Sequence, residues 1–440
     1  MRNTFYVRTF GCQMNDHDSE RIAGLLGAMG LQPVDVPEDA DVLVYNTCSI
    51  REKADTRLLG HLGTARRLKA EDPGRRVVIA GCLAQSRREA FFAEHPYVDV
   101  LVGPQSLHML PSLVEESRSG DGPVGAFEES TTRWSGELPR ARGRGPLASI
   151  QIMAGCSNYC SYCIVPYVRG PEASRPEDDI LCEAAALVAD GVREITLLGQ
   201  NVNAYGLEPG FKGKTDFPGL LRSLSAVEGL DRLRFMTSHP KDVSSALIEA
   251  IATLKPVCEH LHLPVQSGSD RVLRAMRRGY DRAEYLELVD RLRSSVPGLA
   301  LTTDVIIGFP GETEDDFEKT LSLVDEVGYD AAFTFQYSPR RNTAAAELPG
   351  RFSGEILEKR MRRLVELTQS WGARRNAVLV GGEVEVLVEG RSRRGGELAM
   401  GRTRTYKTVN FPGDAQAGEM VSVRVTGSSS ASLRGESSPS

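Results

Sequence analysis

The sequence predicts an α/β protein made of three units: an N-terminal parallel sheet covered by helices, a central open barrel of six βα units, and a small C-terminal antiparallel β-barrel. Two patterns indicate this fold class. Apolar, strand-like runs alternate with amphipathic helices up to about residue 372, which is typical of parallel sheets. From residue 373 onward, apolar and polar residues instead alternate with a period of two, which is typical of antiparallel strands.

Length and composition agree with this architecture. A chain of 440 residues corresponds to about three domains, and 41% hydrophobic with 25% charged residues is the balance of a globular protein. No apolar run approaches the ~18 residues of a membrane helix, and the N-terminus lacks the pattern of a secretory signal. We therefore expect a cytoplasmic protein without a membrane partner. Its eight cysteines are too few for a disulfide scaffold and favour metal binding or chemistry.

The first domain is expected over residues 1–118. Three apolar runs, at 3–12, 40–48 and 75–82, each read as a strand that ends in a cysteine, and a helical stretch follows each of them (15–30, 50–70 and 83–95). Residues 119–145, rich in Gly, Pro, Ser and Arg, are predicted to be a linker.

Cys12, Cys48 and Cys82 are the cysteines that end these three strands. Ligands of open α/β sheets bind at the carboxyl ends of the strands, so adjacent parallel strands would bring the three thiols together. The alternative is that cysteine stands there only as a small hydrophobic residue. Because all three strands end this way, we favour a ligand set; Cys182 and Cys258 are assigned to packing.

The second domain is expected over residues 146–372. Candidate strands lie at 148–155, 194–203, 233–239, 260–266, 299–309 and 331–338, with amphipathic helices at 176–191, 283–296 and 312–328 and a last helix at 355–376. Six units are too few for a closed eight-unit barrel and favour an open, partial one.

Cys156, Cys160 and Cys163 form the most specific local motif, on a tight loop after the first of these strands. Three thiolates can hold three irons of a four-iron cubane and leave the fourth iron open to a substrate, whereas an electron-transfer ferredoxin uses four. A structural zinc site would need a fourth ligand nearby. His239, His260 and His262 are distant in sequence and are expected to be hydrogen-bonded or packed, so an iron cluster is favoured over zinc.

Polar loops at the ends of the later strands are predicted to line one barrel mouth and contact a cofactor. Glycines there allow close approach of the backbone to a ligand, and no Ser-His-Asp arrangement competes, which fits chemistry carried by a cofactor. The predicted contacts are Gly199, Gln200, Asn201, His262, Gln266, Ser267, Asp304, Gly308, Gly311 and Glu312, with Asn203, Ser269 and Thr313 in the same loops.

The third domain is expected over residues 373–440. It carries 10 Lys/Arg against 7 Asp/Glu, whereas the whole chain has a net charge of −6. Arg402, Arg404 and Lys407 interleave with Tyr406 and Phe411 on what reads as one strand, a surface that suits looped or single-stranded RNA. An ordinary solvated strand face is the alternative. Arg140, Arg142 and Arg144 of the linker could extend the basic surface, and residues 432–436 could add one more strand.

With these motifs together, the chain resembles the methylthiotransferases of the radical S-adenosylmethionine superfamily over essentially its whole length, with residues 373–440 similar to a TRAM domain. The sequence is most similar to the branch that acts on N6-dimethylallyladenosine in tRNA. Residues 11–15, 46–54, 164–167 and 237–240 match sequence motifs of that branch. The phrases of the branches acting on threonylcarbamoyl-adenosine or on a ribosomal protein are absent.

Two further sequence motifs of the family can be compared with this chain. Arg169, Gly170, Glu172, Ser174 and Arg175 reproduce one of them. The other departs from the family at Asn342, where a glycine is usual, and we expect the turn to survive because Asn tolerates the left-handed conformation.

The resemblance implies two [4Fe-4S] clusters with separate tasks. Cys156, Cys160 and Cys163 would hold the cluster that binds S-adenosylmethionine and generates a radical; Cys12, Cys48 and Cys82 would hold the cluster that carries the inserted sulfur. It further implies that the methylthio group goes to C2 of isopentenyladenosine beside the anticodon of tRNA, with Arg402, Arg404, Tyr406 and Lys407 contacting the RNA. A flavodoxin or ferredoxin would supply electrons to a monomeric enzyme. The alternatives are the two sibling activities and a zinc-stabilised RNA-binding protein without catalysis.

Overall fold

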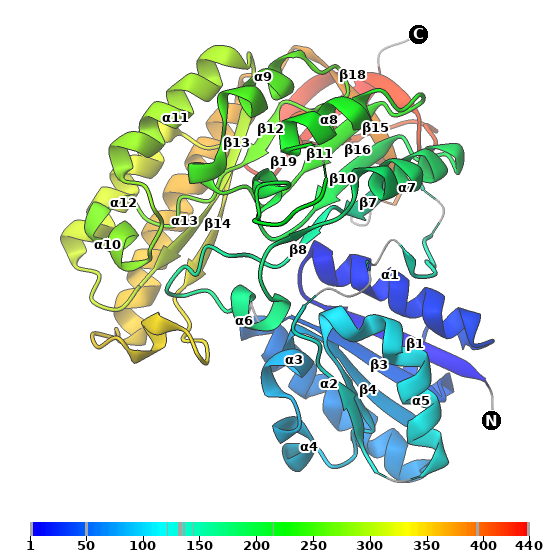
Figure 1. Cartoon of the computed structure of the whole chain (residues 1–440). Coiled ribbons are helices and arrows are strands. Elements are labelled where there is room, and N and C mark those ends of the chain that lie inside the picture. The colour runs from blue at the N-terminus through cyan, green and yellow to red at the C-terminus, as the bar shows by residue number, and fades with distance from the viewer. Residues whose placement is uncertain are drawn as a thin grey trace.

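The computed structural model describes residues 3–48, 52–120, 122–130, 134, 137–143, 145–213, 215–392 and 396–437. Ser49–Arg51 of one family phrase and Arg144 of the basic linker lie outside the described residues. Figure 1 shows the N-terminal domain below the central domain, with the C-terminal barrel at the opposite end of the central domain. The expected domain boundaries at 118, 146 and 373 stay predictions.

The N-terminal domain is a six-stranded sheet in the order β2-β1-β3-β4-β5-β6, with every neighbouring pair parallel. Helices α1 (Gln13–Ala28) and α5 (Leu110–Ser119) pack on one face, and α2 (Glu52–Glu71) and α4 (Ala90–Glu94) pack on the other. The strands are β1 Thr4–Phe10, β2 Gln32–Pro33, β3 Val42–Thr47, β4 Arg76–Gly81, β5 Val100–Val102 and β6 Val124–Ala126.

The three predicted cysteine-ending strands are confirmed as β1, β3 and β4, and they are adjacent. Two details differ from the expectation. The helix expected at 83–95 is split into α3 (Cys82–Arg87) and α4. The break falls at Arg88, whose φ is positive, at 45°, whereas a right-handed helix requires a negative φ. The linker expected at 119–145 contains β6, whose short apolar run completes the sheet edge beside β5.

The central domain has the six parallel strands that the sequence predicts. Two three-stranded sheets, β7-β10-β11 and β12-β13-β14, are joined by a bridge between Leu233 and Val257, so they form one open partial barrel. Helices pack outside around a continuous apolar core. The strands are β7 Leu147–Gln151, β10 Glu194–Leu198, β11 Arg232–Phe235, β12 His260–His262, β13 Ala300–Ile307 and β14 Ala331–Gln336; the helices are α7 Glu177–Ala189, α8 Phe217–Ser225, α9 Ser245–Thr253, α10 Asp270–Ala275, α11 Arg282–Ser295 and α12 Glu314–Val327.

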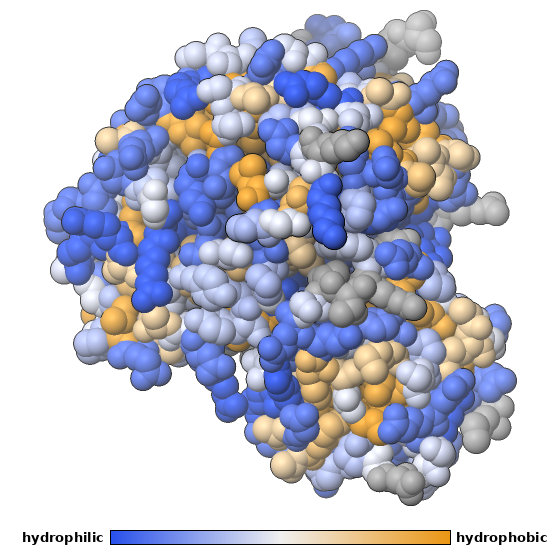
Figure 2. All heavy atoms as spheres, viewed as in Figure 1, coloured by the Kyte–Doolittle hydropathy of each residue, from blue (hydrophilic) through white to orange (hydrophobic). Residues whose placement is uncertain are grey.

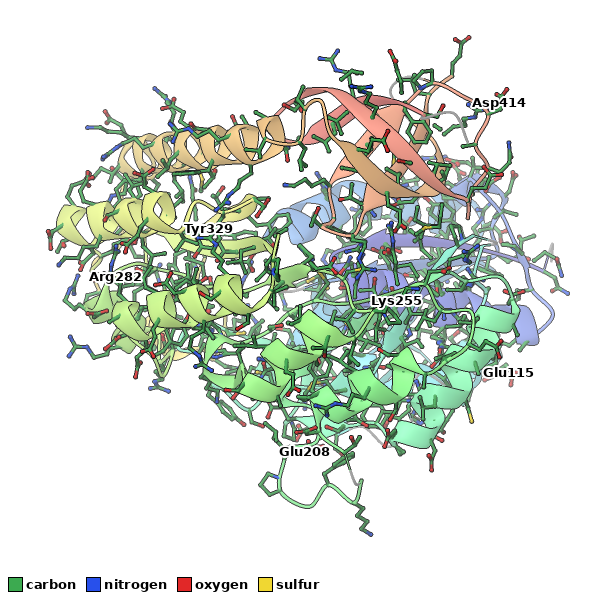
Figure 3. The ribbon with its side chains drawn as sticks, turned by 90° about the horizontal axis from the view of Figure 1, so that it is seen from above. Glu115, Glu208, Lys255, Arg282, Tyr329 and Asp414 are labelled. Atoms are coloured by element: carbon green, nitrogen blue, oxygen red, sulfur yellow. The ribbon has the colours of Figure 1, made fainter. Side chains whose placement is uncertain are left out.

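Helix α13 (Gly354–Ala377) leads from the central domain into a closed barrel with the strand order β15-β16-β17-β19-β18. Figure 3 shows this barrel next to α13, with Asp414 on its outer side and Tyr329 inside the central domain. The possible strand at 432–436 is confirmed as β19. The strands are β15 Glu383–Arg391, β16 Ala399–Thr403, β17 Thr408–Phe411, β18 Met420–Ser428 and β19 Ser432–Ser437.

One expectation about this barrel is wrong: Arg402, Tyr406 and Phe411 do not lie on one strand. The chain turns between β16 and β17, where Tyr406 has a φ of 64° and its N–H donates to the Thr403 carbonyl. Arg and Thr alternate from Arg402 to Thr405 with no Gly, Pro, Asn or Asp to mark the turn, so the sequence pattern conceals it. Phe411 is fully buried inside the barrel.

Hydrophobic residues on the face in Figure 2 form several separate patches among hydrophilic ones. None of the described helices is both long and apolar enough to span a lipid bilayer.

Candidate active site

The N-terminal cysteines meet at one edge of the sheet. Cys12 is the N-cap of α1, Cys48 follows β3, and Cys82 is the first residue of α3. Glycines precede two of them because the space is tight: a Cβ on Gly11 would lie 2.8 Å from the Cβ of Cys48, and one on Gly81, where φ is 93°, would lie 2.5 Å from the Thr47 carbonyl oxygen. The sequence-predicted triad is therefore brought together.

These thiols lie in a strongly polarised environment. The pKa of Cys12 is lowered to about 6, chiefly by a hydrogen bond with Cys48; the Arg169 guanidinium and the backbone N–H groups of Asn15 and Met14 act in the same direction. Burial raises the pKa of Cys82, while Arg169 opposes that shift. The thiolate is the metal-binding form of cysteine. The lowered pKa of Cys12 favours this form at that residue.

The second triad lies on the loop between β8 (Met153–Ala154) and α6 (Val165–Arg169). The loop is closed by two backbone hydrogen bonds, from Cys156 N–H to the Gly170 carbonyl (3.1 Å) and from Cys163 N–H to the Cys160 carbonyl (2.9 Å). The three sulfurs interact electrostatically. Burial raises the pKa of Cys156 to about 11 and that of Cys163 to about 12, so metal binding would have to release their protons.

The two triads are neighbours across the domain boundary. Cys82 packs against Val168 of α6 and against Ile164, the N-cap of this helix, which begins just after the second cysteine loop. From the end of this helix, Arg169 donates from Nε to the sulfur of Cys82 (3.4 Å) and from Nη2 to Asp18 (2.8 Å). The sequence alone did not reveal this role of Arg169. The one signal in the sequence was the intact family motif that begins at this residue.

Each residue of that family motif makes a polar contact in the central domain or with the N-terminal domain. Gly170 receives the Cys156 hydrogen bond, and its φ of 73° suits glycine. Glu172 accepts from Asn201, Ser174 bonds to Glu208, and Arg175 donates to Glu183. Arg278 is a further residue that the sequence did not reveal: it donates from Nη1 to the sulfur of Cys160 (3.4 Å).

Three residues predicted to contact a cofactor at the barrel mouth have a buried polar atom with no hydrogen-bond partner among the described residues. Gln200 accepts from the Gly155 N–H, yet its Nε2 has no partner, and Asn201 donates to Asp242 while its Oδ1 has none. Gln266, with a φ of 73°, also leaves Oε1 unpaired. A buried polar atom without a partner is costly, so these three atoms fit a ligand with polar groups.

His262 and Asp304 lie on the neighbouring strands β12 and β13. The His262 ring bonds to Thr302 (3.0 Å) and contacts Asp304 (3.4 Å). Phe333 is the cross-strand neighbour of Asp304 and meets the His262 ring edge-to-face, yet it is 51% exposed. An exposed phenyl ring beside the polar side chains of His262 and Asp304, on the edge strand β14, offers a flat apolar surface to a ligand.

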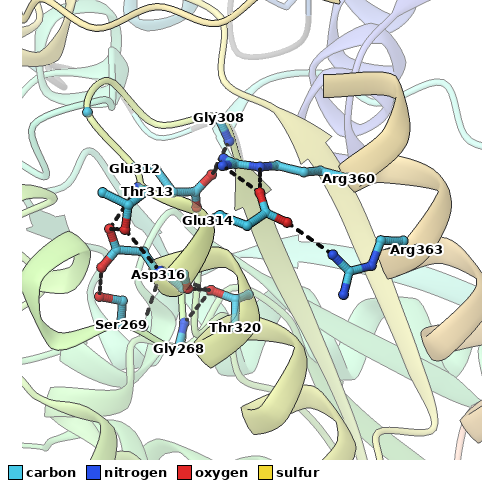
Figure 4. A network of polar contacts seen from close by, with 12 residues as sticks. Gly268, Ser269, Gly308, Glu312, Thr313, Glu314, Asp316, Thr320, Arg360 and Arg363 are labelled. Atoms are coloured by element: carbon cyan, nitrogen blue, oxygen red, sulfur yellow. Dashed lines mark hydrogen bonds and ion pairs between the residues drawn. The ribbon is translucent and has the colours of Figure 1, made fainter. Parts of the chain in front are cut away.

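Other predicted contacts hold loops in place (Figure 4). The Glu312 carboxylate accepts from the Gly308 N–H and from Arg360 of α13, both at 2.7 Å, and burial raises its pKa to about 7. Gly311 N–H donates to the Gly350 carbonyl. Ser267 bonds to Thr320, and Ser269 bonds to Asp316. Gly199 is packed so closely that a Cβ would lie 2.5 Å from the Met153 side chain.

The predicted RNA contacts lie at the junction with the central domain. Arg404 pairs with Glu259 and Lys407 with Asp330, both residues of the central domain. The Tyr406 ring stacks on His260 (5.0 Å between centroids), with the Arg234 and Arg402 guanidinium groups over it. The expected free basic and aromatic strand face is thus corrected: these side chains pair and stack with residues of the central domain. Whether they also contact RNA stays a prediction.

The remaining expectations have mixed outcomes. Cys258 is buried, as assigned, but Cys182 is exposed, because α7 turns Ile180, Ala184 and Leu187 inward. Asn342 adopts the expected left-handed conformation, with a φ of 65°.

Among the described residues, no three His, Cys, Asp or Glu side chains converge closely enough to hold a single metal ion. A four-iron cubane makes a different demand, because each thiolate binds a separate iron and the sulfurs stay apart. Three sulfur donors at each site suit that cluster, whereas a structural zinc site uses four protein ligands.

Family models agree with these three parts of the chain. "Uncharacterized protein family UPF0004" matches residues 4–103, "Radical SAM superfamily" matches 150–324, and "TRAM domain" matches 377–437. The partial barrel with its three-cysteine loop therefore defines a radical S-adenosylmethionine protein, as the resemblance indicated.

Relatives that match this chain over nearly its full length identify one family within the superfamily. Proteins named tRNA-2-methylthio-N(6)-dimethylallyladenosine synthase are 48% identical in Moorella thermoacetica, over 99% of this chain and 98% of the relative, and 45% identical in Burkholderia cenocepacia, over 99% and 97%. The relative from Clostridium botulinum is 45% identical over 98% and 96%. The chain belongs to the family of tRNA-2-methylthio-N(6)-dimethylallyladenosine synthases.

Solved structures share the fold at low sequence identity. The radical S-adenosylmethionine methyltransferase TsrM from Kitasatospora setae aligns with a TM-score of 0.56 at 14% identity, over 79% of this chain and 77% of that one. The radical enzyme OxsB aligns with a TM-score of 0.51 at 12% identity, over 84% and 57%.

Proposed function

We propose that this protein transfers a methylthio group to C2 of N6-isopentenyladenosine, the base on the 3′ side of the tRNA anticodon. The observation that carries the proposal is the juxtaposition of two three-cysteine sites, joined by the contact of Arg169 with Cys82, in a chain 48% identical to a named synthase over its full length. One site suits radical formation, and the other can hold the group to be transferred. The chain would act as three domains, over residues 1–118, 146–372 and 373–440.

The six cysteines are the proposed cluster ligands. Cys156, Cys160 and Cys163 would hold one [4Fe-4S] cluster, and Cys12, Cys48 and Cys82 would hold a second. When bound, the clusters and S-adenosylmethionine would supply a 5′-deoxyadenosyl radical, the inserted sulfur and its methyl group. The tight loop and the glycines at 11 and 81 would keep both sets of thiolates in place.

Residues of the barrel mouth would orient S-adenosylmethionine. Gln200, Asn201 and Gln266 have buried polar atoms that need partners, and the amino, carboxylate and ribose groups of this cofactor could provide them. His262 and Asp304 would also contact it. Gly199, Ser267, Gly308, Gly311 and Glu312 would act by fixing the loops that carry these groups.

The substrate base would enter beside β14. Anticodon loops are single-stranded, so a base can be turned out and stacked on an aromatic side chain. Phe333, half exposed, offers that surface to the adenine and its apolar isopentenyl group. The C-terminal barrel, which the TRAM model matches, would bind the rest of the loop, and a flavodoxin or ferredoxin would donate electrons. We further propose a monomer that acts in the cytoplasm.

The test is an assay with purified, iron-loaded protein, S-adenosylmethionine, a reductant and anticodon stem–loops. The proposal predicts the methylthio product from the isopentenylated stem–loop. A stem–loop carrying threonylcarbamoyl-adenosine, or a ribosomal peptide, should remain unmodified. Product from either of those substrates instead, or zinc in place of iron in the protein as isolated, would contradict it.

A further inference from the structure

Two buried guanidinium groups each point at one sulfur of a cysteine triad. Arg169 Nε lies 3.4 Å from the sulfur of Cys82, and Arg278 Nη1 lies 3.4 Å from the sulfur of Cys160. Both arginines are 4% exposed, and both donate into the sulfur instead of into water. The two contacts have the same chemistry, but each belongs to a different triad.

Each guanidinium is held in its orientation by other partners. Arg169 donates from Nη2 to the buried carboxylate of Asp18 (2.8 Å), and its carbonyl accepts from Gln105. Arg278 donates from Nη2 to the Pro264 carbonyl (2.8 Å) and from Nε to the Tyr280 hydroxyl (3.0 Å). The planar fork of arginine makes these bonds together, which the single ammonium of lysine cannot do.

Burying a charge is costly unless the charge is paired. The Arg169 side chain has one carboxylate, Asp18, and Arg278 has neutral oxygen partners. Negative thiolates at Cys82 and Cys160 would complete both environments. The placement of each arginine is thus explained best by a charged sulfur centre beside it.

We infer that Arg169 and Arg278 are positioning residues that set the reduction potentials of the two clusters, Arg169 for the cluster on Cys12, Cys48 and Cys82 and Arg278 for the cluster on Cys156, Cys160 and Cys163. The inference rests on the proposed function. Hydrogen bonds to ligand sulfurs and nearby positive charge stabilise the reduced, more electron-rich cluster, so each arginine raises the potential of its own cluster.

The experiment uses full-length protein that keeps one cluster at a time. Replacing Cys156, Cys160 and Cys163 by Ala leaves the N-terminal site, and replacing Cys12, Cys48 and Cys82 by Ala leaves the other. In each background, Arg169→Gln and Arg278→Gln are compared by redox titration followed by electron paramagnetic resonance, with iron and sulfide measured in the same samples. Each variant is the matched control of the other, because both remove one buried guanidinium.

We expect Arg169→Gln to lower the one-electron potential of the N-terminal cluster only, and Arg278→Gln to lower that of the other cluster only. The lysine variants, which keep the charge but lose the fork, should fall between parent and Gln. Unchanged potentials at full iron content, or equal shifts of both clusters by either variant, would overturn the inference.

Should Arg169→Gln fail to load iron, Arg169→Lys decides the question at the N-terminal site. A lowered potential in this variant supports the inference, and an unchanged one overturns it. If the two parent backgrounds themselves bind no iron and sulfide, the proposed function fails. If they bind both and only the potentials stay fixed, the inference alone fails.

Discussion

Arg169 and Cys82 lie 3.4 Å apart although they are 87 positions apart in the chain and belong to different domains. The contact forms because α6, which follows the second cysteine loop, docks on α3 of the N-terminal domain, with Ile164 and Val168 against Cys82. The Arg169–Asp18 ion pair, with both side chains 4% exposed, fixes the same junction. Two sites that the sequence separates are therefore parts of one centre.

The separation of roles predicts the behaviour of Cys12→Ala. This variant should lose about half of the bound iron and all methylthiolation, yet still form 5′-deoxyadenosine from S-adenosylmethionine, because the other triad is intact. Liquid chromatography with mass spectrometry measures both products. Cys182→Ala, which changes an exposed cysteine, should resemble the parent. Loss of 5′-deoxyadenosine in Cys12→Ala would contradict the division of labour.

Gly81→Ala should damage the N-terminal triad through the backbone. Its φ of 93° is unfavourable for alanine, and the added Cβ would lie 2.5 Å from both the Asn46 side chain and the Thr47 carbonyl oxygen. We expect about 1–3 kcal/mol of destabilisation and less iron at that site. Gly27→Ala, in α1 with no atom near its Cβ, should be neutral or stabilising by about 0.5–1 kcal/mol. Thermal unfolding and iron analysis compare them; equal effects would refute the steric argument.

We expect the folded protein to lose stability in acid because of His239. Burial, with the charges of Arg278 and Lys241, lowers its pKa to about 2, against 6.5 in the unfolded chain. Below about pH 6.5 the unfolded state therefore binds the extra proton, so this contribution is present above that value and falls as the pH drops. At about pH 5 the loss is about 2 kcal/mol.

His239→Asn keeps an acceptor for the Lys241 N–H without a titrating ring. The Tm of this variant should fall less than that of the parent between about pH 7 and about pH 5. Parallel falls in Tm would show that His239 does not carry the effect.

Tyr406→Ala should loosen the C-terminal barrel from the central domain. The ring stacks on His260 and lies beneath two guanidinium groups, and its removal should weaken docking by about 1–3 kcal/mol. Hydrogen–deuterium exchange should rise at β12 and in the β16–β17 turn. Arg424→Ala, on an exposed position of β18, is the control. Weaker tRNA binding with unchanged exchange would instead assign Tyr406 to RNA.

Phe333→Ala tests the proposed stacking surface. Loss of a stacked base costs about 1–3 kcal/mol, so KM for the isopentenylated stem–loop should rise about 10-fold or more, while 5′-deoxyadenosine formation without substrate stays unchanged. Ile356→Ala on α13, also an exposed apolar residue, should leave KM unaltered. A fall in substrate-free cleavage of S-adenosylmethionine would place Phe333 at the cofactor instead.

Local patterns in the sequence were sufficient for the fold and for both cysteine sets. Strands ending in Cys12, Cys48 and Cys82 could be joined by one general rule, that parallel strands present their carboxyl ends at one edge. The Cys156 motif needed only the spacing of three residues on one loop.

Contacts between residues far apart in the sequence could not be derived in this way. Arg278 reaches Cys160 across 118 positions, and nothing in the sequence around either residue encodes that approach. The basic residues at 402–407 show the converse. Their pattern suited RNA, but Arg404 pairs with Glu259 and Lys407 with Asp330, whose positions only the tertiary structure reveals.

The most direct test of the proposed function is mass spectrometry of tRNA nucleosides from a host that lacks its own enzyme, with and without this gene. The account predicts that the methylthio-isopentenyl nucleoside appears and its isopentenyl precursor declines. An unchanged precursor in cells that make folded, iron-loaded protein would contradict it.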